Sequence, residues 1–207
     1  MTDVWPIVHA ERTALITDLE QLADPAWDES SLCEEWTVHD VVAHLVDSAV
    51  TTRMGFLVGL ALARFDFDRQ NDLGVRRERR LSARATLERL RGVAERTSTP
   101  PAPLDSRIVE EIVHGEDIRR PLGLTRSYPG EAVVRALHHQ SGTPVKFGGA
   151  KETVSVVRVM ATDSDVSIGE GPRVSGPALA LLLALSGRRV ALAELDGPGV
   201  GRLANGL

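Results

Sequence analysis

The spacing of apolar residues predicts helices along the first two thirds of the chain. Apolar side chains recur at intervals of three or four residues in five segments: 4–22, 37–65, 81–96, 107–120 and 130–140. At the start of the second segment, Thr37 and Asp40 have the spacing of a capping box. This segment is apolar on several sides, as expected of a helix surrounded by others. Residues 66–80 are strongly charged and are expected to form a loop or the solvated start of a helix.

The pattern changes near residue 145. Residues 153–161 alternate between apolar and polar side chains, which predicts a strand, and residues 165–168 and 173–175 suggest a hairpin or a short strand pair. Residues 177–186 predict a buried helix with proline in its first turn. We therefore expect a mainly α protein, with a helical bundle over residues 1–145 and a small α+β domain over residues 146–207.

The composition is that of an ordinary globular protein and excludes several functions. The chain is 43% hydrophobic and 26% charged, with a net charge of −5. This charge, without basic runs interleaved with aromatic residues, argues against nucleic-acid binding. The longest apolar run, 178–185, is too short to cross a bilayer, and the N-terminus lacks a signal-peptide pattern. We expect a cytoplasmic monomer or homodimer that binds neither nucleic acid nor membrane.

The helix predicted at 107–120 places two functional groups on one face. Glu110 and His114 are four residues apart, so their Cβ atoms lie roughly 5–6 Å from each other. A carboxylate and an imidazole so placed can bind one water, substrate proton or metal ion. Glu111 and Asp117 are each three residues from His114 and compete for the same role, and spacing alone does not choose between them. The alternative is an exposed pair that adds a few tenths of a kcal/mol to the helix.

His44 lies among apolar residues of the second predicted helix and is expected to be buried. A buried neutral imidazole needs partners for its nitrogens, for example a backbone carbonyl and the Ser48 hydroxyl. Alternatively, His44 completes a three-ligand set with Glu110 and His114. Three protein ligands with an open position are typical of catalytic zinc, and the set also suits nickel or iron. The remaining histidines are expected to be surface or packing residues: His9, His39, His138 and His139.

Segments 32–45 (LCEEWTVHDVVAHL) and 110–123 (EEIVHGEDIRRPLG) carry recognisable motifs. They resemble "GWTVRDVVAHL" and "E-x-x-x-H-G-x-D-x-R-R-x-L-G" of the mycothiol-dependent maleylpyruvate isomerase family, within the DinB-like metal-binding superfamily. Weaker similarity extends over 71–76 and much of the C-terminal part. The resemblance implies a DinB-like up-down four-helix bundle. It also implies one divalent metal, expected to be zinc, bound by His44, Glu110 and His114.

Two residues depart from the family pattern. Glu35 stands where the family usually has glycine, and Glu116 where tryptophan is common. The C-terminal part also looks shorter than in the isomerase, where it helps to complete the active site. Recognition of thiol and substrate is therefore less well defined by the sequence than the metal site.

The resemblance implies mycothiol as a thiol co-substrate. A metal stabilises the thiolate of a bound thiol at neutral pH. Cys33, the only cysteine, lies before the helix and several residues from His44, so we expect the sulfur to come from a small molecule. Asp40 and Asp117 are candidates to orient the ligand histidines. Arginines that could hold an acidic substrate are Arg53, Arg76, Arg77 and Arg119.

The expected function is therefore that of a metal- and mycothiol-dependent isomerase or S-transferase acting on a small electrophilic substrate. Addition of the thiolate, bond rotation and elimination would give isomerisation, whereas addition alone would give an S-conjugate. Three alternatives remain: a non-catalytic metal-binding helical domain, a metal-dependent hydrolase, and a metal-free bundle with a polar core.

Overall fold

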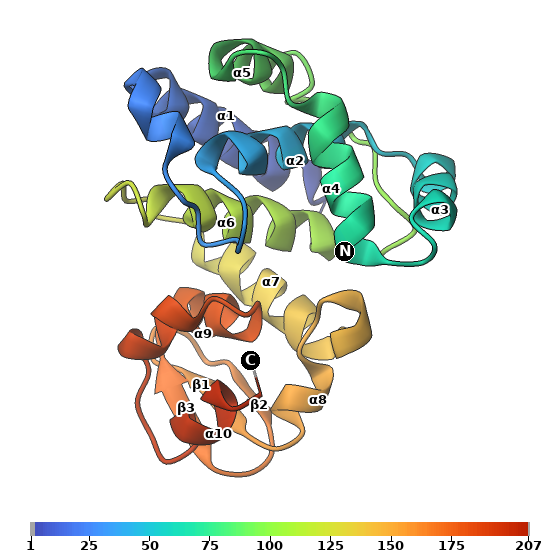
Figure 1. The fold of residues 1–207 in the computed structure, drawn as a ribbon. Helices are drawn as coiled ribbons and strands as arrows, with labels where there is room; N and C mark the ends of the chain where they lie inside the picture. The colour runs from blue at the N-terminus through green and yellow to red at the C-terminus, as the bar shows by residue number, and fades with distance from the viewer. Residues whose placement is uncertain (1–2, 207) are drawn as a thin grey trace. The chain divides into compact units, whose positions relative to one another are not determined.

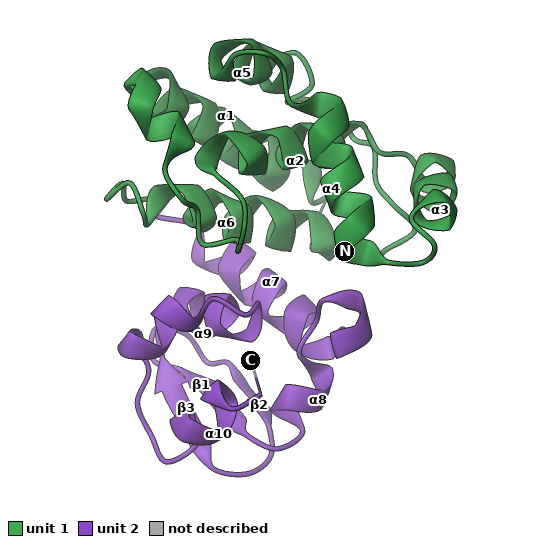
Figure 2. Cartoon of the chain, in the orientation of Figure 1, with its two compact units in different colours: residues 1–126 green, residues 127–207 purple. Residues whose placement is uncertain are grey.

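The computed structural model describes residues 3–206, which belong to two compact units, residues 1–126 and 127–207 (Figures 1 and 2). The division lies earlier than the boundary near residue 145 that the change of pattern predicts. The reason is that α7 (Gly130–Gly142) packs against α9 (Ala178–Leu185) and so belongs to the second unit.

The first unit is helical. Its core lies among α1, α2, α5 and α6, with Leu19, Leu45, Leu90 and Ile118 in one buried cluster. The elements are α1 (Trp5–Glu20), η1 (Asp24–Asp28), α2 (Val38–Val50), α3 (Arg53–Leu62), α4 (Phe67–Glu78), α5 (Ala83–Arg91) and α6 (Asp105–Arg119). The expectation of a mainly α fold is confirmed, and none of the helices formed by the described residues is long and apolar enough to cross a membrane.

The helix expected over 37–65 is interrupted. α2 begins at the predicted capping box, which is confirmed: Thr37 Oγ1 accepts from the Asp40 N–H, and Asp40 accepts from the Thr37 N–H. At Thr51 and Thr52 the backbone becomes extended, and Thr52 caps α3 by accepting from the Gly55 N–H. Two consecutive threonines favour such a break because their side chains bond to nearby backbone groups and their branching disfavours the helix.

Buried ion pairs join α1 to α6. Arg12 Nε lies 2.7 Å from Glu111 Oε1, and both side chains are almost fully buried. About two helical turns further along, Arg119 Nε donates to Asp18 Oδ2 at 2.7 Å. Arg12 also donates to the carbonyl oxygens of Ala94 and Arg96, after the end of α5. These contacts fix the rotation of α6 and hence which of its residues face α2.

The second unit is α+β, as expected. It contains α7, η2 (Val145–Phe147), α8 (Lys151–Val154), β1 (Arg158–Ala161), β2 (Ser167–Gly169), β3 (Arg173–Gly176), α9, η3 (Arg189–Glu194) and α10 (Val200–Ala204). α9 is buried among these elements, as its uniformly apolar sequence predicts. The strand expected over 153–161 is shorter, because residues 151–154 form α8.

The hairpin interpretation of β2 and β3 is wrong. The strand order is β2-β1-β3, with β1 antiparallel to β2 and parallel to β3. Gly169 is required at the end of β2, since it has φ +86° and a Cβ there would lie 2.2 Å from the Val154 carbonyl oxygen. After Gly169 the chain passes the start of β1 and continues to the opposite edge of that strand, where β3 pairs with it.

Candidate metal centre

His44, Glu110 and His114 meet between α2 and α6. His44 Nε2 lies 2.9 Å from Glu110 Oε1, and the rings of His44 and His114 are 4.7 Å apart, centroid to centroid, at 71°. One ligand atom from each residue lies within 4.8 Å of the other two. The three side chains expected to form the site from the sequence are thus brought together by two helices.

The chemistry of this donor set fits a divalent cation. Two imidazoles and one carboxylate are the ligands of many catalytic zinc sites. Nδ1 of His44 is buried and has no hydrogen-bond partner among residues 3–206.

Glu110 and Glu111 contact different neighbours, and these contacts distinguish the two carboxylates, which their spacing from His114 alone did not. Glu110 contacts His44, whereas Glu111 is engaged by Arg12 of α1. Burial raises the pKa of Glu111 despite the Arg12 charge. Of these two carboxylates, only Glu110 is therefore placed to serve as a ligand with His114.

Arg107 controls the charge of Glu110. Burial alone would raise the pKa of the Glu110 carboxyl, but the charge of Arg107, the hydrogen bond from His44 and the two imidazoles outweigh it and hold this pKa well below its usual range. Arg107 Nη2 is 3.7 Å from Glu110 Oε2, and its Nη1 donates to Ser48 Oγ at 2.8 Å. Ser48 thus bonds Arg107, whereas the core-histidine alternative paired it with His44.

Asp117 and Cys33 lie on the other side of His114. Asp117 Oδ2 is 2.9 Å from His114 Nδ1 and accepts from the Cys33 thiol at 3.0 Å. Cys33 Sγ is also 3.7 Å from His114 Nδ1, so Cys33, His114 and Asp117 form a second group with metal-ligand geometry. Asp117 is thus within hydrogen-bond distance of His114. Setting Cys33 apart from the site was wrong, because the loop before α2 folds back over α6, where the Leu32 N–H donates to the Asp117 carbonyl.

The same loop places Trp36 against the site. Its ring lies 5.0 Å from that of His44, and its Nε1 donates to Asp72 Oδ1 of α4 at 3.1 Å. The preceding residue, Glu35, has φ +65°, a left-handed conformation that favours glycine. This geometry explains the glycine that the family motif carries at this position.

Other residues expected near the site lie elsewhere. Asp40 completes the capping box and pairs with Arg79 at 2.7 Å, so its bonds do not orient His44. Arg119 is fully buried and paired with Asp18, which removes it from the arginines expected to hold substrate. His39 is buried against Thr86, in agreement with a packing role. Arg107, which the sequence argument did not consider, is the arginine that reaches the site.

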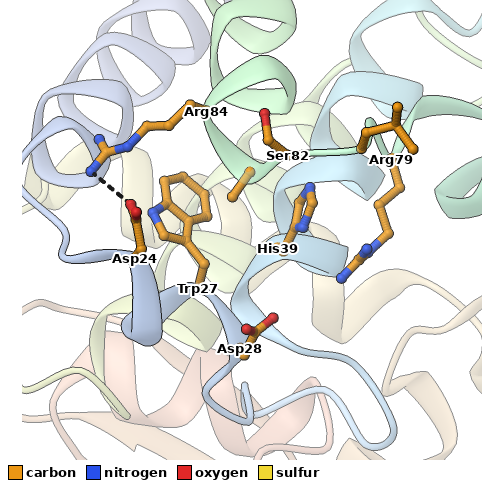
Figure 3. Close-up of a pocket in the computed structure, with 9 residues that line it drawn as sticks. Asp24, Trp27, Asp28, His39, Arg79, Ser82 and Arg84 are labelled. Carbon is orange, nitrogen blue, oxygen red and sulfur yellow. Dashed lines mark ion pairs between the residues drawn. The ribbon is translucent and has the colours of Figure 1, made fainter.

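A cleft of about 290 Å³ at the start of α2 is separate from these residues (Figure 3). It is lined by Trp27 and His39, with Arg84 and Arg79 at its sides. Both arginines face carboxylates, since Arg84 lies 3.7 Å from Asp24 and Arg79 pairs with Asp40. The cleft therefore offers no uncompensated positive charge to an anion, and none of the three candidate metal ligands lines it.

Comparisons with known proteins identify the family of the chain and a shared fold. The model of the mycothiol maleylpyruvate isomerase N-terminal domain matches residues 8–119, which include His44, Glu110 and His114. Two crystal structures of mycothiol-dependent maleylpyruvate isomerase, one of a histidine-to-alanine mutant, have TM-scores of 0.65 and 0.66 at 13% identity, covering 94% of this chain and 91% of theirs. No curated protein matches the sequence. The fold is DinB-like, as expected, and the chain belongs to the mycothiol maleylpyruvate isomerase N-terminal domain family.

Proposed function

We propose that the protein is a metal- and mycothiol-dependent enzyme, an isomerase or S-transferase acting on a small electrophilic substrate. The observation that carries the proposal is the meeting of His44, Glu110 and His114 between α2 and α6. Membership of the isomerase family supports the thiol requirement. The two solved isomerase structures support the same architecture over nearly the whole chain.

His44, Glu110 and His114 would hold the metal, expected to be zinc, which when bound lowers the pKa of a thiol. The low pKa of Glu110 keeps its carboxylate ionised at neutral pH, so the ligand is ready without losing a proton. Asp117 orients His114 by accepting from Nδ1 at 2.9 Å. The Trp36 ring packs against the ring of His44, with centroids 5.0 Å apart.

The first test is the metal content of the purified protein and of three variants, His44→Ala, Glu110→Gln and His114→Ala. We expect about one metal ion per wild-type chain and loss of metal in each variant, because each substitution leaves only two of the three protein ligands. His138→Ala is the matched control, since His138 is exposed and in the second unit. Equal metal retention by His44→Ala and wild type would show that the ligand set is wrong.

The second test separates thiol chemistry from hydrolysis. Turnover of an electrophilic substrate should require added mycothiol or a thiol surrogate. The turnover rate should rise with pH through an ionisation whose pKa is below that of a free thiol, about 8.5. This pH-dependent activity should be lost after metal removal and should persist in Cys33→Ser. Full turnover of an electrophilic ester in thiol-free buffer would instead support a hydrolase, and intact metal with no thiol binding would support a non-catalytic domain.

A further inference from the structure

His44 lacks the hydrogen bond that orients the other candidate ligand histidine. Its Nε2 lies 2.9 Å from Glu110 Oε1, whereas its Nδ1 is buried and has no hydrogen-bond partner among residues 3–206. In His114, by contrast, Nδ1 lies 2.9 Å from Asp117 Oδ2. Histidines that bind metals are almost always oriented by a hydrogen bond at the second ring nitrogen. The rotation of the His44 ring must therefore be fixed by packing.

The indole of Trp36 packs against the His44 ring. The two ring centroids are 5.0 Å apart and the rings are inclined at 44°, which is within the range of interacting aromatic pairs. The His114 ring is also close to His44, at 4.7 Å, but His114 is itself a candidate ligand. Trp36 can therefore support His44 without binding the metal.

Trp36 is itself held at both its backbone and its side chain. Its N–H donates to the Cys33 carbonyl at 3.2 Å, and its carbonyl accepts from the N–H and the hydroxyl of Ser31 at 3.0 Å and 2.8 Å. The indole Nε1 donates to Asp72 Oδ1 at 3.1 Å. The backbone contacts fix the starting point of the side chain, and the hydrogen bond to Asp72 restrains the two torsions that turn the indole plane.

Asp72 reaches this position because α4 lies very close to α2. A Cβ on Gly74 would be 2.4 Å from Oδ2 of Asp47, so a larger residue would displace the Asp47 carboxylate. Asp47 is three residues after His44 and therefore lies on the neighbouring turn of the same face. The close approach at Gly74 thus brings the preceding turn of α4, with Asp72, beside the site.

α4 covers only part of the apolar segment 37–65. Burial of this segment is confirmed for α2, most of whose residues are buried, and is wrong for α3, none of whose residues is buried. The reason is that the backbone changes direction at Thr51 and Thr52. Residues 71–76, which resemble the family more weakly than the ligand motifs do, include both Asp72 and the point where α4 meets α2.

We infer that Trp36 and Asp72 are positioning residues for His44: Asp72 fixes the indole of Trp36, and the indole holds the imidazole with Nε2 toward Glu110. The inference rests on the proposed function, because it takes His44 as a metal ligand. A ring that already has this orientation loses less freedom when the metal binds, so binding is stronger. α4 then contributes to the metal site although the three candidate ligands lie on α2 and α6.

Asp72 is the residue at which positioning can be separated from packing. Trp36 packs against the apolar core of the first unit, so replacing it would also disturb that core. Asp72 is exposed and contacts Trp36 through the indole N–H. Asp72→Ala removes this acceptor, whereas Asp72→Asn removes the charge and keeps a side-chain oxygen that can accept.

Competition with a chromogenic chelator on the full chain measures the effect on metal affinity. We expect a loss of about 10-fold in Asp72→Ala, the lower end for groups that orient metal ligands, and a change within about 2-fold in Asp72→Asn. Asp68→Ala is the matched control, because Asp68 is exposed on the same helix and carries the same charge. Equal losses in Asp72→Ala and Asp72→Asn, or in Asp72→Ala and Asp68→Ala, would overturn the inference in favour of a charge effect.

A double-mutant cycle tests whether Asp72 acts through Trp36. Trp36→Phe keeps an aromatic ring but has no N–H to donate. Adding Asp72→Ala to Trp36→Phe should therefore cause no further loss of metal affinity, because the two changes break the same hydrogen bond. Additive losses would show that Asp72 acts independently of Trp36 and would overturn the inference. Circular dichroism should show that all variants stay folded.

The orientation of His44 can also be measured without any metal. In the NMR spectrum of metal-free protein, the nearby indole shifts the signals of the His44 ring C–H groups. We expect these signals to coincide in wild type and Asp72→Asn and to move in Asp72→Ala. Signals that stay in place in Asp72→Ala would overturn the inference, whether or not the protein binds metal. A wild type that shows the expected shifts but binds no metal would refute the proposed function and still support the positioning of His44 by Trp36 and Asp72.

Discussion

Replacing Cys33 tests how His114 is held. The Cys33 thiol and His114 Nδ1 lie 3.0 Å and 2.9 Å from the same oxygen, Asp117 Oδ2. The thiol therefore restrains the carboxylate that in turn restrains the imidazole. We expect Cys33→Ala to weaken metal binding modestly and Cys33→Ser to preserve it, because a hydroxyl can replace the thiol as donor.

The size of the effect follows from what each change removes. A thiol is a weak donor, and a typical hydrogen bond contributes about 0.5–1.5 kcal/mol, so the lower half of that range corresponds to roughly a 2- to 5-fold loss of metal affinity in Cys33→Ala. In Asp117→Asn the charged acceptor of His114 is lost. The expected loss is about 10- to 100-fold, as for other groups that orient metal-binding histidines.

Competition with a chromogenic chelator measures these affinities, and Co(II) substitution identifies the sulfur. If Cys33 only positions Asp117, Co(II) protein without added thiol has no thiolate-to-cobalt charge-transfer band. A band in wild type that disappears in Cys33→Ser would refute the reasoning, since Cys33, His114 and Asp117 would then be the ligands. The serine variant is also the correct background for detecting an external thiol, because any band it shows comes from the added molecule.

Three further changes test the fold around the site. Glu35→Gly should raise the free energy of unfolding by about 1 kcal/mol in urea denaturation, because Glu35 has φ +65°. A lower value would contradict the left-handed assignment. Arg12→Met should cost about 3–5 kcal/mol in the same assay by leaving Glu111 buried without its partner, and Arg12→Met/Glu111→Leu should recover much of this loss. Burial lowers the pKa of His39, so below about pH 6.5 the unfolded state binds more protons than the folded state and the free energy of unfolding decreases as the pH is lowered. His39→Gln should make this decrease smaller in thermal melts between about pH 7 and pH 5. An unchanged decrease would exclude His39 as its source.

The juxtaposition of the three candidate ligands was partly predictable because some of its signals are local, although the choice of Glu110 over Glu111 came from the family resemblance. Glu110 and His114 share a helix face through their spacing alone, and the Thr37 cap placed the start of α2, so that His44 fell in its interior. Cys33 could not be placed in this way. Its position depends on a loop returning over α6 through one backbone hydrogen bond from Leu32, and no periodic pattern encodes such a contact.

The errors at α3 and in the sheet have a related cause. An apolar helix looks the same in sequence whether its own chain or a second molecule covers it, so the pattern over 53–62 indicated burial where the chain provides none. Similarly, short strands separated by Gly169 and Pro172 suggest a hairpin, but the pairing partner is chosen by packing. β1 lies between β2 and β3 because the chain crosses the start of β1 after Gly169, where the Pro172 carbonyl accepts from the Arg158 N–H.

The charge balance of the site gives a physical reason to expect an anionic sulfur ligand. Glu110 supplies one negative charge, held ionised by Arg107, while the second carboxylate of the pair, Glu111, is withdrawn from the site by Arg12. With two neutral imidazoles, a divalent ion would keep one net positive charge within its ligands, and Arg107 adds another nearby. Had Glu111 also faced α2, the site would be neutral and would attract a thiolate less strongly. If the proposed metal site is correct, the ion pair between Arg12 and Glu111 would set how many carboxylates the site contains, in addition to joining α1 to α6.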